Sequence, residues 1–513
     1  MTPKVHVEPA LDWLEKWNLY SPRKTALIDG DTGKAVSYQH FYQRACAGAV
    51  QLKDKFKIGF GDRVAAVCTN ELEYVVLFYA LQRLGAVLVP VNFRFTEKEI
   101  DYVLENCEAK LVVTQKSFFE KLQNVRKQNL ELKFELTDLN ELLPRLDSNE
   151  ISAASVKALP FSEKATQDTP VMILYTSGTT GFPKGAVLSH GMLFWNAVNT
   201  SLRLNISQDD CAVIFLPLFH TGGWNVLMTP FLHRGATIIL TKKFEADQVL
   251  NLSEKHECTL LFGVPTTMDM MSRSASFPQI HLKKLRYAVV GGEPMPIDLI
   301  RTWTNKGISI RQGYGLTEFG PNVFSLNEED SIRKIGSIGF PNFYIDVKIM
   351  DEFTEVKANE VGELWLRGPM CMLGYWKNEK ATSETIVDGW LKTGDLVRKD
   401  EEGYVYVVGR KKEMYISGGE NVYPAEVEKV LRSFPLIREA AVIGVQDEKW
   451  GEVGKAFIAL EQPPEELNVK ALEGKILEFC LANLAKFKVP KYIQFIDSLP
   501  KGESGKILKK ELR

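Results

Sequence analysis

The chain has 513 residues, more than a single hydrophobic core usually supports, so two or more domains are expected. Charged residues make up 25%, hydrophobic residues make up 45%, and there are 37 glycines, which excludes disordered, collagenous and coiled-coil proteins. The 63 basic and 65 acidic side chains nearly cancel, so no global field draws the chain to nucleic acid or to an anionic membrane. The expected partner is a small molecule.

The cysteines and the chain ends bear on location. The seven cysteines are odd in number, widely spaced and outside any C-x-x-C pattern, so reduced thiols are expected. Residues 1–12 lack a basic segment followed by an apolar run, and no stretch has the roughly 18 apolar residues of a membrane span. The last three residues, 511–513, are no peroxisomal signal. We therefore predict a cytoplasmic protein without a transmembrane segment.

Short apolar runs alternate with helical periodicity from residue 62 to residue 114, which predicts parallel strands covered by helices. The predicted strands are 64–68, 87–91 and 111–114, and the predicted helices are 71–84 and 96–106. Similar strand–helix units recur at 236–256 and 260–272. Residues 116–169 are polar with weak periodicity and predict a surface excursion without chemistry of its own. The predicted fold class is α/β, with a parallel-rich large region that extends past residue 300.

The pattern of apolar and glycine residues in the sequence changes after Gly362. Short strand patterns at 363–367 and 404–408, separated by glycines, predict smaller β structure of a distorted, barrel-like kind. A helix at 424–433, a strand at 440–444, a helix at 469–484 and a polar tail then predict a small α+β domain. We expect a large N-terminal domain at 1–410 and a small C-terminal domain at 411–513.

The most informative stretch is YTSGTTGFPKG at residues 175–185, which follows a strand-like run at 171–174 and precedes an apolar, helix-like run. Its glycines permit positive φ, so that consecutive N–H groups can converge on an anion. Four hydroxyls and one cation add to these donors, as a polyphosphate requires. The groups concerned are Thr176, Ser177, Gly178, Thr179, Thr180, Gly181, Lys184 and Gly185. Pro183 and Gly185 break the Walker pattern, so a P-loop is excluded, and a flexible surface turn is the alternative.

This loop resembles the signature loop of the adenylate-forming superfamily, which includes acyl-CoA synthetases, luciferases and peptide-synthetase adenylation domains. Four further stretches occur in the order of that family, namely QGYGLTE at 312–318, WLKTGD at 390–395, Gly409–Arg410 and Gly505–Lys506. The resemblance covers nearly the whole chain. It implies a ligase in which a carboxylate attacks the α-phosphorus of ATP, giving acyl-AMP and pyrophosphate, and a thiol then displaces AMP. The implied cofactors are ATP, Mg²⁺ and coenzyme A.

The resemblance also implies roles around the nucleotide. Tyr314 can offer its ring face to adenine. Glu318 follows Thr317 and is the expected Mg²⁺ ligand, since Mg²⁺ prefers carboxylate oxygen; both residues are assigned to catalysis. Asp395 is expected to accept hydrogen bonds from the ribose, and Arg410 to bind the sugar or a phosphate through its planar guanidinium. The remaining nucleotide residues flank the tyrosine or line the opposite side of the base: Gly292, Glu293, Pro294, Gly313 and Gly315.

The C-terminal part is implied to serve both half-reactions. Lys506 occupies the position of the catalytic lysine of the family, which contacts the substrate carboxylate and the α-phosphate, whereas Lys501, Lys509 and Lys510 inherit no such role. The small domain is expected to be mobile and to rotate between the half-reactions, with Lys412 at the hinge. The loop formed by Ser417, Gly418, Gly419 and Glu420 would then admit a pantetheine arm. From the residues alone, a solvated tail, a plain surface lysine and an ordinary turn are the alternatives.

The segment PLFHTGGWN at 217–225 is similar to the family segment that leads to the acid pocket. His220 is expected to gate the site and contact the carboxylate, and is assigned to catalysis, with a packed structural histidine as the alternative. The candidate pocket walls are Met228, Val264, Thr266 and Met268. Residues 215–230 contain no aspartate to hold an α-ammonium group, which disfavours amino-acid substrates.

Several features of the function stay open at this point. A medium- or long-chain fatty acid is the first prediction for the substrate, with an aryl or succinylbenzoate-type acid second. The acceptor is coenzyme A or the pantetheine of a carrier protein. Luciferase-like oxidation shares the same motifs, and a nucleotide-binding protein without turnover is the non-enzymatic alternative. The oligomeric state is undecided, with a homodimer among the options.

Overall fold

The computed structural model describes residues 10–143, 159–176, 183–352, 354–461, 469–501 and 507–512. The chain divides into two compact units, of which unit 1 comprises Met1–Asp346 with Leu366–Leu391. Unit 2 comprises Val347–Trp365 with Lys392–Arg513. This division groups residues 392–410 with the C-terminal residues, so the proposed boundary between 410 and 411 stays a prediction.

The first sheet of unit 1 contains the predicted alternation of strands and helices. Its strand order is β19-β8-β7-β4-β3-β5-β6. The bounds are β3 Arg63–Val67, β4 Val87–Pro90, β5 Leu111–Thr114, β6 Glu135–Asp138, β7 Pro170–Thr176, β8 Lys184–Ser189 and β19 Gly374–Tyr375. Strands β3 to β7 pair in parallel, whereas β8 and β19 are antiparallel to their neighbours. The predictions for 64–68, 87–91 and 111–114 are confirmed.

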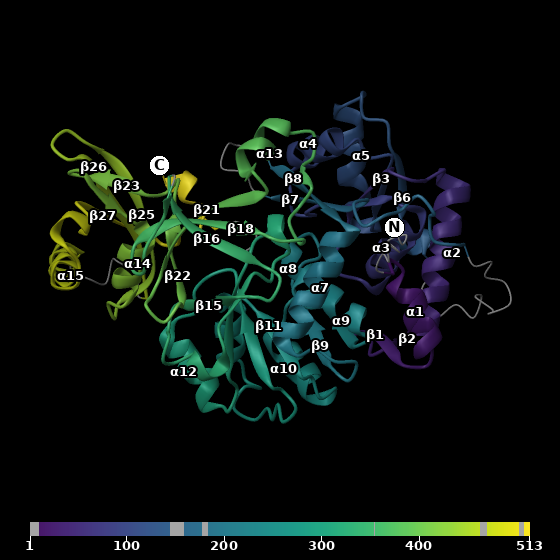
Figure 1. Cartoon of the computed structure of the whole chain (residues 1–513), viewed down its shortest axis with the longest axis horizontal. Coiled ribbons are helices and arrows are strands. Elements are labelled where there is room, and N and C mark those ends of the chain that lie inside the picture. Colours follow the sequence, from purple (N-terminus) through teal and green to yellow (C-terminus); the bar gives the residue numbers. More distant parts are fainter. Residues whose placement is uncertain are drawn as a thin grey trace, which may run out of the picture. The chain divides into compact units, whose positions relative to one another are not determined.

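Helices cover both faces of this sheet. Figure 1 shows α4 (Glu97–Cys107) and α5 (Phe119–Gln128) above the sheet and α3 (Leu72–Leu84), which contacts β4, below it. Helix α2 (Tyr38–Phe56) packs against α3. Ile100 and Leu122 of the upper helices pack in one core cluster with Ala65 and Val112 of the strands. The prediction for 116–169 is corrected in part, because α5 and β6 extend the layers of the domain. Their polar sequence concealed this role, since few of their residues are buried: Leu122 and Val125 of α5, and Thr137 and Asp138 of β6.

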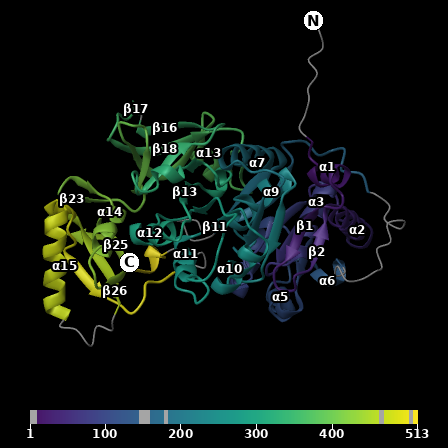
Figure 2. The same cartoon turned by 90° about the horizontal axis from the view of Figure 1, so that it is seen from below.

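A second sheet of unit 1 has the order β2-β1-β10-β9. Its strands are β1 Thr25–Asp29, β2 Ala35–Ser37, β9 Cys211–Ile214 and β10 Thr237–Leu240. Strands β1, β10 and β9 pair in parallel, whereas β2 is antiparallel to β1. Figure 2 shows β1 and β2 beside α2, in agreement with their contacts.

The third group of strands in unit 1 has the order β11-β12-β13-β14-β15. The bounds are β11 Leu260–Gly263, β12 Tyr287–Val290, β13 Ile310–Tyr314, β14 Phe324–Ser325 and β15 Ser337–Pro341. Strands β11 to β13 are parallel, and α10 (Ala246–Lys255), α11 (Pro265–Ser272) and α12 (Ile297–Asn305) accompany them. The other helices of unit 1 are α1 Trp13–Tyr20, α6 Leu139–Leu142, α7 His190–Leu204, α8 Thr221–Asn225, α9 Met228–Arg234 and α13 Glu379–Thr385.

Unit 2 contains two groups of strands. The first has the order β22-β21-β18-β16-β17, with β16 Asp346–Asp351, β17 Thr354–Glu355, β18 Val361–Arg367, β21 Trp390–Lys399 and β22 Val405–Arg410. The second has the order β24-β23-β26-β25, with β27 beside β26. Its bounds are β23 Tyr415–Ser417, β24 Glu420–Val422, β25 Ile437–Asp447, β26 Gly451–Leu460 and β27 Tyr492–Phe495.

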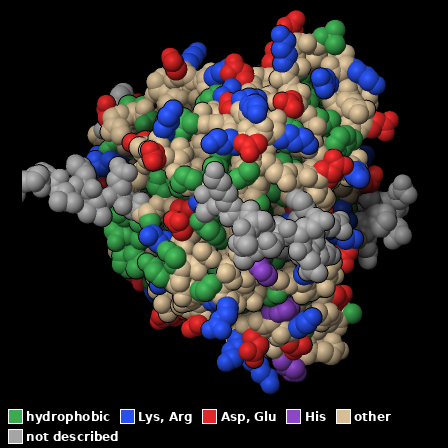
Figure 3. Space-filling model, turned by 90° about the vertical axis from the view of Figure 1, so that its right-hand side faces the viewer, with side chains coloured by type: hydrophobic (Ala, Val, Ile, Leu, Met, Phe, Trp, Pro, Cys, Tyr) green, Lys and Arg blue, Asp and Glu red, His purple; other side chains and the backbone are tan. Residues whose placement is uncertain are grey.

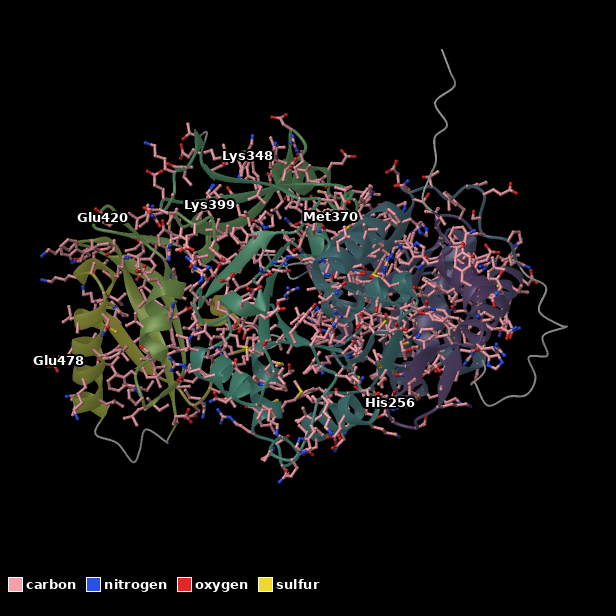
Figure 4. All side chains as sticks on the ribbon, turned by 60° about the horizontal axis from the view of Figure 1, so that its bottom comes forward. His256, Lys348, Met370, Lys399, Glu420 and Glu478 are labelled. Carbon is pink, nitrogen blue, oxygen red and sulfur yellow. The ribbon has the colours of Figure 1, made fainter. Side chains whose placement is uncertain are left out.

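Two helices complete the C-terminal core of unit 2. Helices α14 (Pro424–Arg432) and α15 (Val469–Asn483) confirm the predictions for 424–433 and 469–484. Val427 and Ile476 of these helices pack with Val442 and Ile458 of β25 and β26. Glu478, on α15, is exposed and projects away from the ribbon in Figure 4.

The surface and the cysteines agree with the composition. On the face drawn in Figure 3, acidic and basic side chains are interspersed, as the near-zero net charge leads one to expect. All seven cysteines are free thiols. Within the part of the chain that the structure describes, no helix combines the length and the apolar character needed to cross a membrane.

Candidate active site

Two segments predicted to enclose the adenine lie together in unit 1. Strands β12 and β13 are parallel neighbours, with Val290 opposite Gln312, so their C-terminal ends share one edge of the sheet. Gly291 follows β12, and a Cβ atom on it would lie 3.4 Å from the carbonyl oxygen of Gly313. Tyr314 ends β13. The structure therefore brings the Gly291–Pro294 stretch and the Tyr314 stretch together.

The two segments differ in exposure. Gly292, Glu293 and Pro294 are exposed, and Gly292 adopts a φ of +88°, in the left-handed region that favours glycine. Tyr314 is half-buried, and its ring packs edge-to-face against Phe324 with centroids 6.0 Å apart. The backbone after β12 is thus accessible, while the tyrosine ring is held from one side.

The turn after Tyr314 requires glycine for space. A Cβ atom on Gly315 would lie 1.8 Å from the carbonyl oxygen of Pro321, a distance that no side chain tolerates. The chain folds back over this glycine into a short 3₁₀ helix, Thr317–Phe319, in which Thr317 and Glu318 are half-buried. The close approach explains why a glycine follows the tyrosine of the QGYGLTE motif.

The phosphate loop is described at its two ends only. Strand β7 ends at Thr176 and β8 begins at Lys184, and these two residues are opposite each other in the antiparallel pair. Ser177, Gly178, Thr179, Thr180 and Gly181 lie outside the described residues.

Two expectations for this stretch are corrected. Gly185 has no positive φ but lies in β8, where a Cβ atom would approach Cγ2 of Ile173 to 2.6 Å. Close packing, and not backbone conformation, is therefore the reason for glycine at this position. The loop is also followed by a strand, and the helix α7 begins only at His190.

Four side chains of unit 1 meet beside the loop. Oη of Tyr375 donates a hydrogen bond to Oε1 of Glu318 at 2.9 Å. Oγ1 of Thr176 lies 3.4 Å from the same carboxylate oxygen and 3.4 Å from the carbonyl oxygen of Lys184, so its single proton serves one of them at a time. Nζ of Lys184 lies 5.2 Å from the ring centroid of Tyr375. Thr176, Lys184 and Glu318, predicted separately, form one cluster.

Tyr375 was not predicted as a site residue. It is 57 positions from Glu318 in the sequence, and no spacing pattern connects the two. The connection is made by β19, which pairs with β8 so that Tyr375 lies opposite Ala186, two residues after Lys184. A sheet pairing of this kind leaves no local signal in the sequence.

The cluster suits a magnesium–phosphate site in its chemistry. Among the described residues there is no group of three or more His, Cys, Asp or Glu side chains that could hold a metal ion by itself. Mg²⁺ is commonly held by one or two carboxylates together with substrate phosphates, so Glu318 beside Lys184 fits it.

The carboxylate of Glu318 also affects a neighbouring cysteine. Burial and, secondarily, the charge of Glu318 raise the pKa of Cys371 to about 12, which keeps that thiol neutral.

The segment predicted to approach the acid is partly packed. His220 directly precedes α8, is half-buried, and has its ring centroid 4.6 Å from that of Phe219. Trp224 is fully buried, with its ring centroid 4.9 Å from that of Phe78. The tryptophan thus anchors the segment in the core, while the histidine lies nearer the surface.

The candidate pocket walls fall into two groups. Met228 and Met268 are fully buried, and Met268 belongs to the core cluster around α11 and α12, as ordinary packing would place it. Val264 is half-buried, and its Cγ1 would lie 3.5 Å from a Cβ atom on Gly292. Thr266 is exposed. Val264 is therefore the pocket candidate beside the predicted nucleotide segment.

The predicted ribose residues lie together in unit 2. Asp395 of β21 and Arg410 of β22 are opposite each other, and Nε of Arg410 lies 2.6 Å from Oδ1 of Asp395. Asp395 is 4% exposed, whereas about half of the Arg410 side chain is exposed. Lys412 is exposed. The structure therefore pairs the carboxylate and the guanidinium that were assigned to one ligand.

The predicted pantetheine loop is a tight hairpin turn. Ser417 and Glu420 are opposite each other in β23 and β24, and Gly418 and Gly419 between them have φ of +60° and +88°. Two positive φ values in a two-residue turn account for both glycines. Ser417 is buried, whereas Glu420 is exposed (Figure 4). Lys506 lies outside the described residues. Lys501 and Ile507, the described residues before and after that gap, form an antiparallel bridge.

Comparison with known families agrees with the fold. The model of the AMP-binding enzyme family matches residues 14–376, and the model of the AMP-binding enzyme C-terminal domain matches residues 426–506. The chain belongs to the AMP-binding enzyme family, and it is a CoA ligase of the adenylate-forming type.

Three curated relatives cover nearly the whole chain. A feruloyl-CoA synthase from Amycolatopsis sp is 37% identical over 96% of this chain and 96% of its own length. A 2-succinylbenzoate–CoA ligase from Bacillus licheniformis is 34% identical, covering 98% and 99%. An indoleacetate–CoA ligase from Aromatoleum aromaticum is 37% identical, covering 98% and 97%.

Solved structures show the same architecture. The o-succinylbenzoate CoA synthetase from Bacillus subtilis with its acyl-adenylate intermediate matches with a TM-score of 0.87 at 31% identity, covering 98% of each chain. The same enzyme with ATP and magnesium gives a TM-score of 0.86 at 31% identity, covering 98% of this chain and 99% of that one. The fatty acyl CoA synthetase from Mycobacterium tuberculosis gives 0.78 at 31% identity, covering 98% and 97%. Ligases of this family use ATP, Mg²⁺ and coenzyme A.

Proposed function

We propose that this CoA ligase acts on a carboxylic acid that carries an aromatic ring. The observation behind this proposal is that three relatives spanning nearly the whole chain are named for ferulate, 2-succinylbenzoate and indoleacetate. In the proposed reaction the acid attacks the α-phosphorus of ATP, which gives acyl-AMP and pyrophosphate. The thiol of coenzyme A then attacks the acyl carbon, the bond to phosphate breaks, and AMP leaves. A fatty acid, the first expectation from the sequence, becomes the second candidate, supported by the likeness to the fatty acyl CoA synthetase.

In the adenylation step, the cluster in unit 1 has the role of holding the triphosphate. Lys184 supplies a cation and Thr176 a hydroxyl donor at the two ends of the loop, and Glu318 supplies the carboxylate for Mg²⁺. When bound, Mg²⁺ neutralises charge on the phosphate oxygens. Tyr314 and the Gly292–Pro294 backbone enclose the adenine. Asp395 and Arg410 bind the ribose. Lys506 binds the carboxylate of the acid and the α-phosphate of ATP.

Transfer to coenzyme A is assigned to the hairpin at Gly418 and Gly419. Apart from the two chain neighbours, no heavy atom of the described residues lies within 4 Å of a Cβ atom built on Gly419, so these residues leave open space there. The small domain rotates about Lys412 between the two half-reactions. His220 gates the entry of the acid. Transfer to the pantetheine of a carrier protein stays an alternative for the acceptor.

One experiment tests the substrate class. The purified chain is mixed with ATP, Mg²⁺, coenzyme A and one acid at a time, and both pyrophosphate release and the thioester product are measured. The panel contains ferulate, 2-succinylbenzoate, indoleacetate, and saturated fatty acids of medium and long chain. Turnover with an aromatic acid at least tenfold faster than with any fatty acid is expected. Faster turnover with a fatty acid than with any aromatic acid would instead assign the substrate class to fatty acids.

Two further expectations also stay predictions. A cytoplasmic location is the first, and fractionation of cells that express the chain at its native level would check it. A homodimer is predicted as one assembly, and light scattering coupled to gel filtration would measure the mass in solution.

A further inference from the structure

The backbone of Tyr375 is held by hydrogen bonds on both sides, although its side chain is only half-buried. Its backbone belongs to β19, and N–H groups on either side of it, at Leu373 and Trp376, donate to carbonyl oxygens of β8 at 3.0 and 2.7 Å. Its own N–H donates to Oγ1 of Thr382 at 2.9 Å. The position of the tyrosine is therefore set by the same strand that begins at Lys184.

The same segment also holds the backbone of Glu318. The N–H of Met372 donates to the carbonyl oxygen of Glu318 at 2.9 Å. Glu318 is thus attached to the 372–376 segment twice, once through its backbone and once through the hydroxyl of Tyr375. Because Glu318 is held both at its backbone and at one carboxylate oxygen, few side-chain rotamers are open to it.

The two carboxylate oxygens of Glu318 differ in their hydrogen bonds. Oε1 accepts from Tyr375 at 2.9 Å and lies 3.4 Å from the hydroxyl of Thr176. Within the described ranges, no protein group donates a hydrogen bond to Oε2. One oxygen is therefore used for orientation, while the other is left for a cation. Groups that donate to a metal-binding side chain commonly orient it in this way.

The ring of Tyr375 has a second contact, with Nζ of Lys184 at 5.2 Å from the ring centroid. An ammonium group over an aromatic face is attracted by the ring quadrupole. One residue thus contacts both the carboxylate for the metal ion and the cation for the phosphate.

From this geometry we infer that Tyr375 is a positioning residue of the magnesium–phosphate site. Its hydroxyl orients Glu318 for the divalent cation, and its ring holds Lys184 beside the loop. The inference rests on the proposed assignment of Glu318 to Mg²⁺, and it adds a residue that makes no contact of its own with the metal ion.

The test separates the hydroxyl from the ring. ATP binding is measured by calorimetry in excess EDTA and again over a series of Mg²⁺ concentrations, and bound divalent cation is measured by electron paramagnetic resonance with Mn²⁺ and ATP. For Tyr375→Phe, we expect unchanged ATP affinity in EDTA and an Mg²⁺ or Mn²⁺ requirement about tenfold higher, as for other partners of metal ligands. For Tyr375→Leu, which also loses the ring, the affinity in EDTA should fall as well.

Two further variants make the outcomes distinguishable. Tyr344→Phe is the matched control, because Tyr344 is 44% exposed in the same unit and should behave like the wild type. Glu318→Gln should abolish the effect of Mg²⁺ on ATP binding. If Glu318→Gln does so and Tyr375→Phe does not change the Mg²⁺ requirement, the inference is overturned and the proposed function stands. If Glu318→Gln has no effect either, the assignment of Mg²⁺ to Glu318 fails and the inference fails with it.

The unchanged affinity in EDTA also serves as the test of folding. A Tyr375→Phe protein that binds ATP normally without metal has an intact loop, so a raised Mg²⁺ requirement then reports on Glu318 alone. Equal loss of ATP affinity in EDTA and in Mg²⁺ would show a merely structural role, and would also overturn the inference.

Discussion

Nζ of Lys509 lies 2.7 Å from Oε2 of Glu413, so the end of the chain is joined to the segment just after Arg410. The same ammonium group lies 2.8 Å from Oε1 of Glu428 on α14, and the lysine side chain is 17% exposed. Burial by itself lowers the pKa of Lys509, but the charges of Glu428 and Glu413 more than offset this and raise it overall. Lys509 therefore stays charged and cross-links three segments of unit 2.

Replacing Lys509 by methionine should destabilise unit 2. The change keeps most of the side-chain volume and removes the cation between two carboxylates, and breaking a buried ion pair from one side costs about 3 kcal/mol or more. Chemical denaturation would measure the loss. Lys510→Met is the control, because Lys510 is exposed on the same short helix and should cost little. Equal stability of both variants would show that the ion pairs do not matter.

Gly315→Ala should damage unit 1 through a single added methyl group. A Cβ atom would lie 1.8 Å from the carbonyl oxygen of Pro321, so the backbone must move, at a cost of about 1–3 kcal/mol or more. ATP affinity should fall as well, because the turn carries Glu318. Gly474→Ala, on α15, should instead stabilise the protein by about 0.5–1 kcal/mol, because no described atom outside the helix backbone lies within 4 Å of the new Cβ. A wild-type melting curve for Gly315→Ala would contradict the packing argument.

His190 should make stability depend on pH. Burial lowers the pKa of His190 to about 4, whereas an unfolded chain binds this proton near pH 6.5. The stabilisation is complete above pH 6.5 and is lost as the pH falls toward 4, by up to about 1.4 kcal/mol per pH unit. His190→Phe keeps an aromatic ring beside Phe161, whose ring centroid is 5.8 Å away, and should reduce the difference in unfolding free energy between pH 7 and pH 5.

His40→Phe is the matched control for this measurement. His40 is exposed on α2, so the variant should keep the pH dependence of the wild type. If His190→Phe also keeps it, another group is responsible.

The two half-reactions should respond to different residues. Gly419→Leu should block thioester formation from acyl-AMP and spare acid-dependent ATP–pyrophosphate exchange, because the side chain would occupy the open space beside the turn. Lys506→Ala should do the reverse, losing exchange while still converting preformed acyl-AMP. Each half-reaction is measured alone, and a loss of at least tenfold in one with less than twofold in the other is expected.

The strain introduced at Gly419 needs its own control. A leucine at a φ of +88° costs about 1–2 kcal/mol whatever surrounds it. Gly33→Leu has the same cost at a φ of +76°, in a turn of unit 1 without an assigned role. Apart from its chain neighbours, no atom in the described part of the chain lies within 4 Å of the new Cβ there either. If Gly33→Leu impairs thioester formation as strongly as Gly419→Leu does, the loss in Gly419→Leu is caused by backbone strain and not by blockage of the space beside the turn.

Much of the fold was accessible to sequence reasoning because it is encoded locally. The buried parallel strands at 64–68 and 87–91 are continuous apolar runs, and the helix between them is fully buried, so periodicity and length identify each element. The motif residues Thr176, Lys184 and Glu318 were also found, since each lies in a recognisable string. Their meeting in one cluster required the structure.

The residues that were missed owe their place to contacts between distant segments. Tyr375 reaches Glu318 through a two-residue strand, and Lys509 reaches Glu413 across 96 positions. In the sequence, Lys509 belongs to a basic tail, where a solvated lysine is the ordinary expectation. Gly185 was assigned to a positive φ, because a glycine that is needed for space cannot be told from one that is needed for conformation.

The pairing of β19 with β8 also bears on how the chain folds during synthesis. Strand β8 lies between β7 and β19, so one of its edges stays open until residues 374–375 have left the ribosome, long after the rest of that sheet is complete. An open edge strand is a template for pairing with other chains. Nascent or truncated chains that end before Leu373 should therefore be prone to aggregate, and a chaperone that covers this edge would act on the N-terminal fragment.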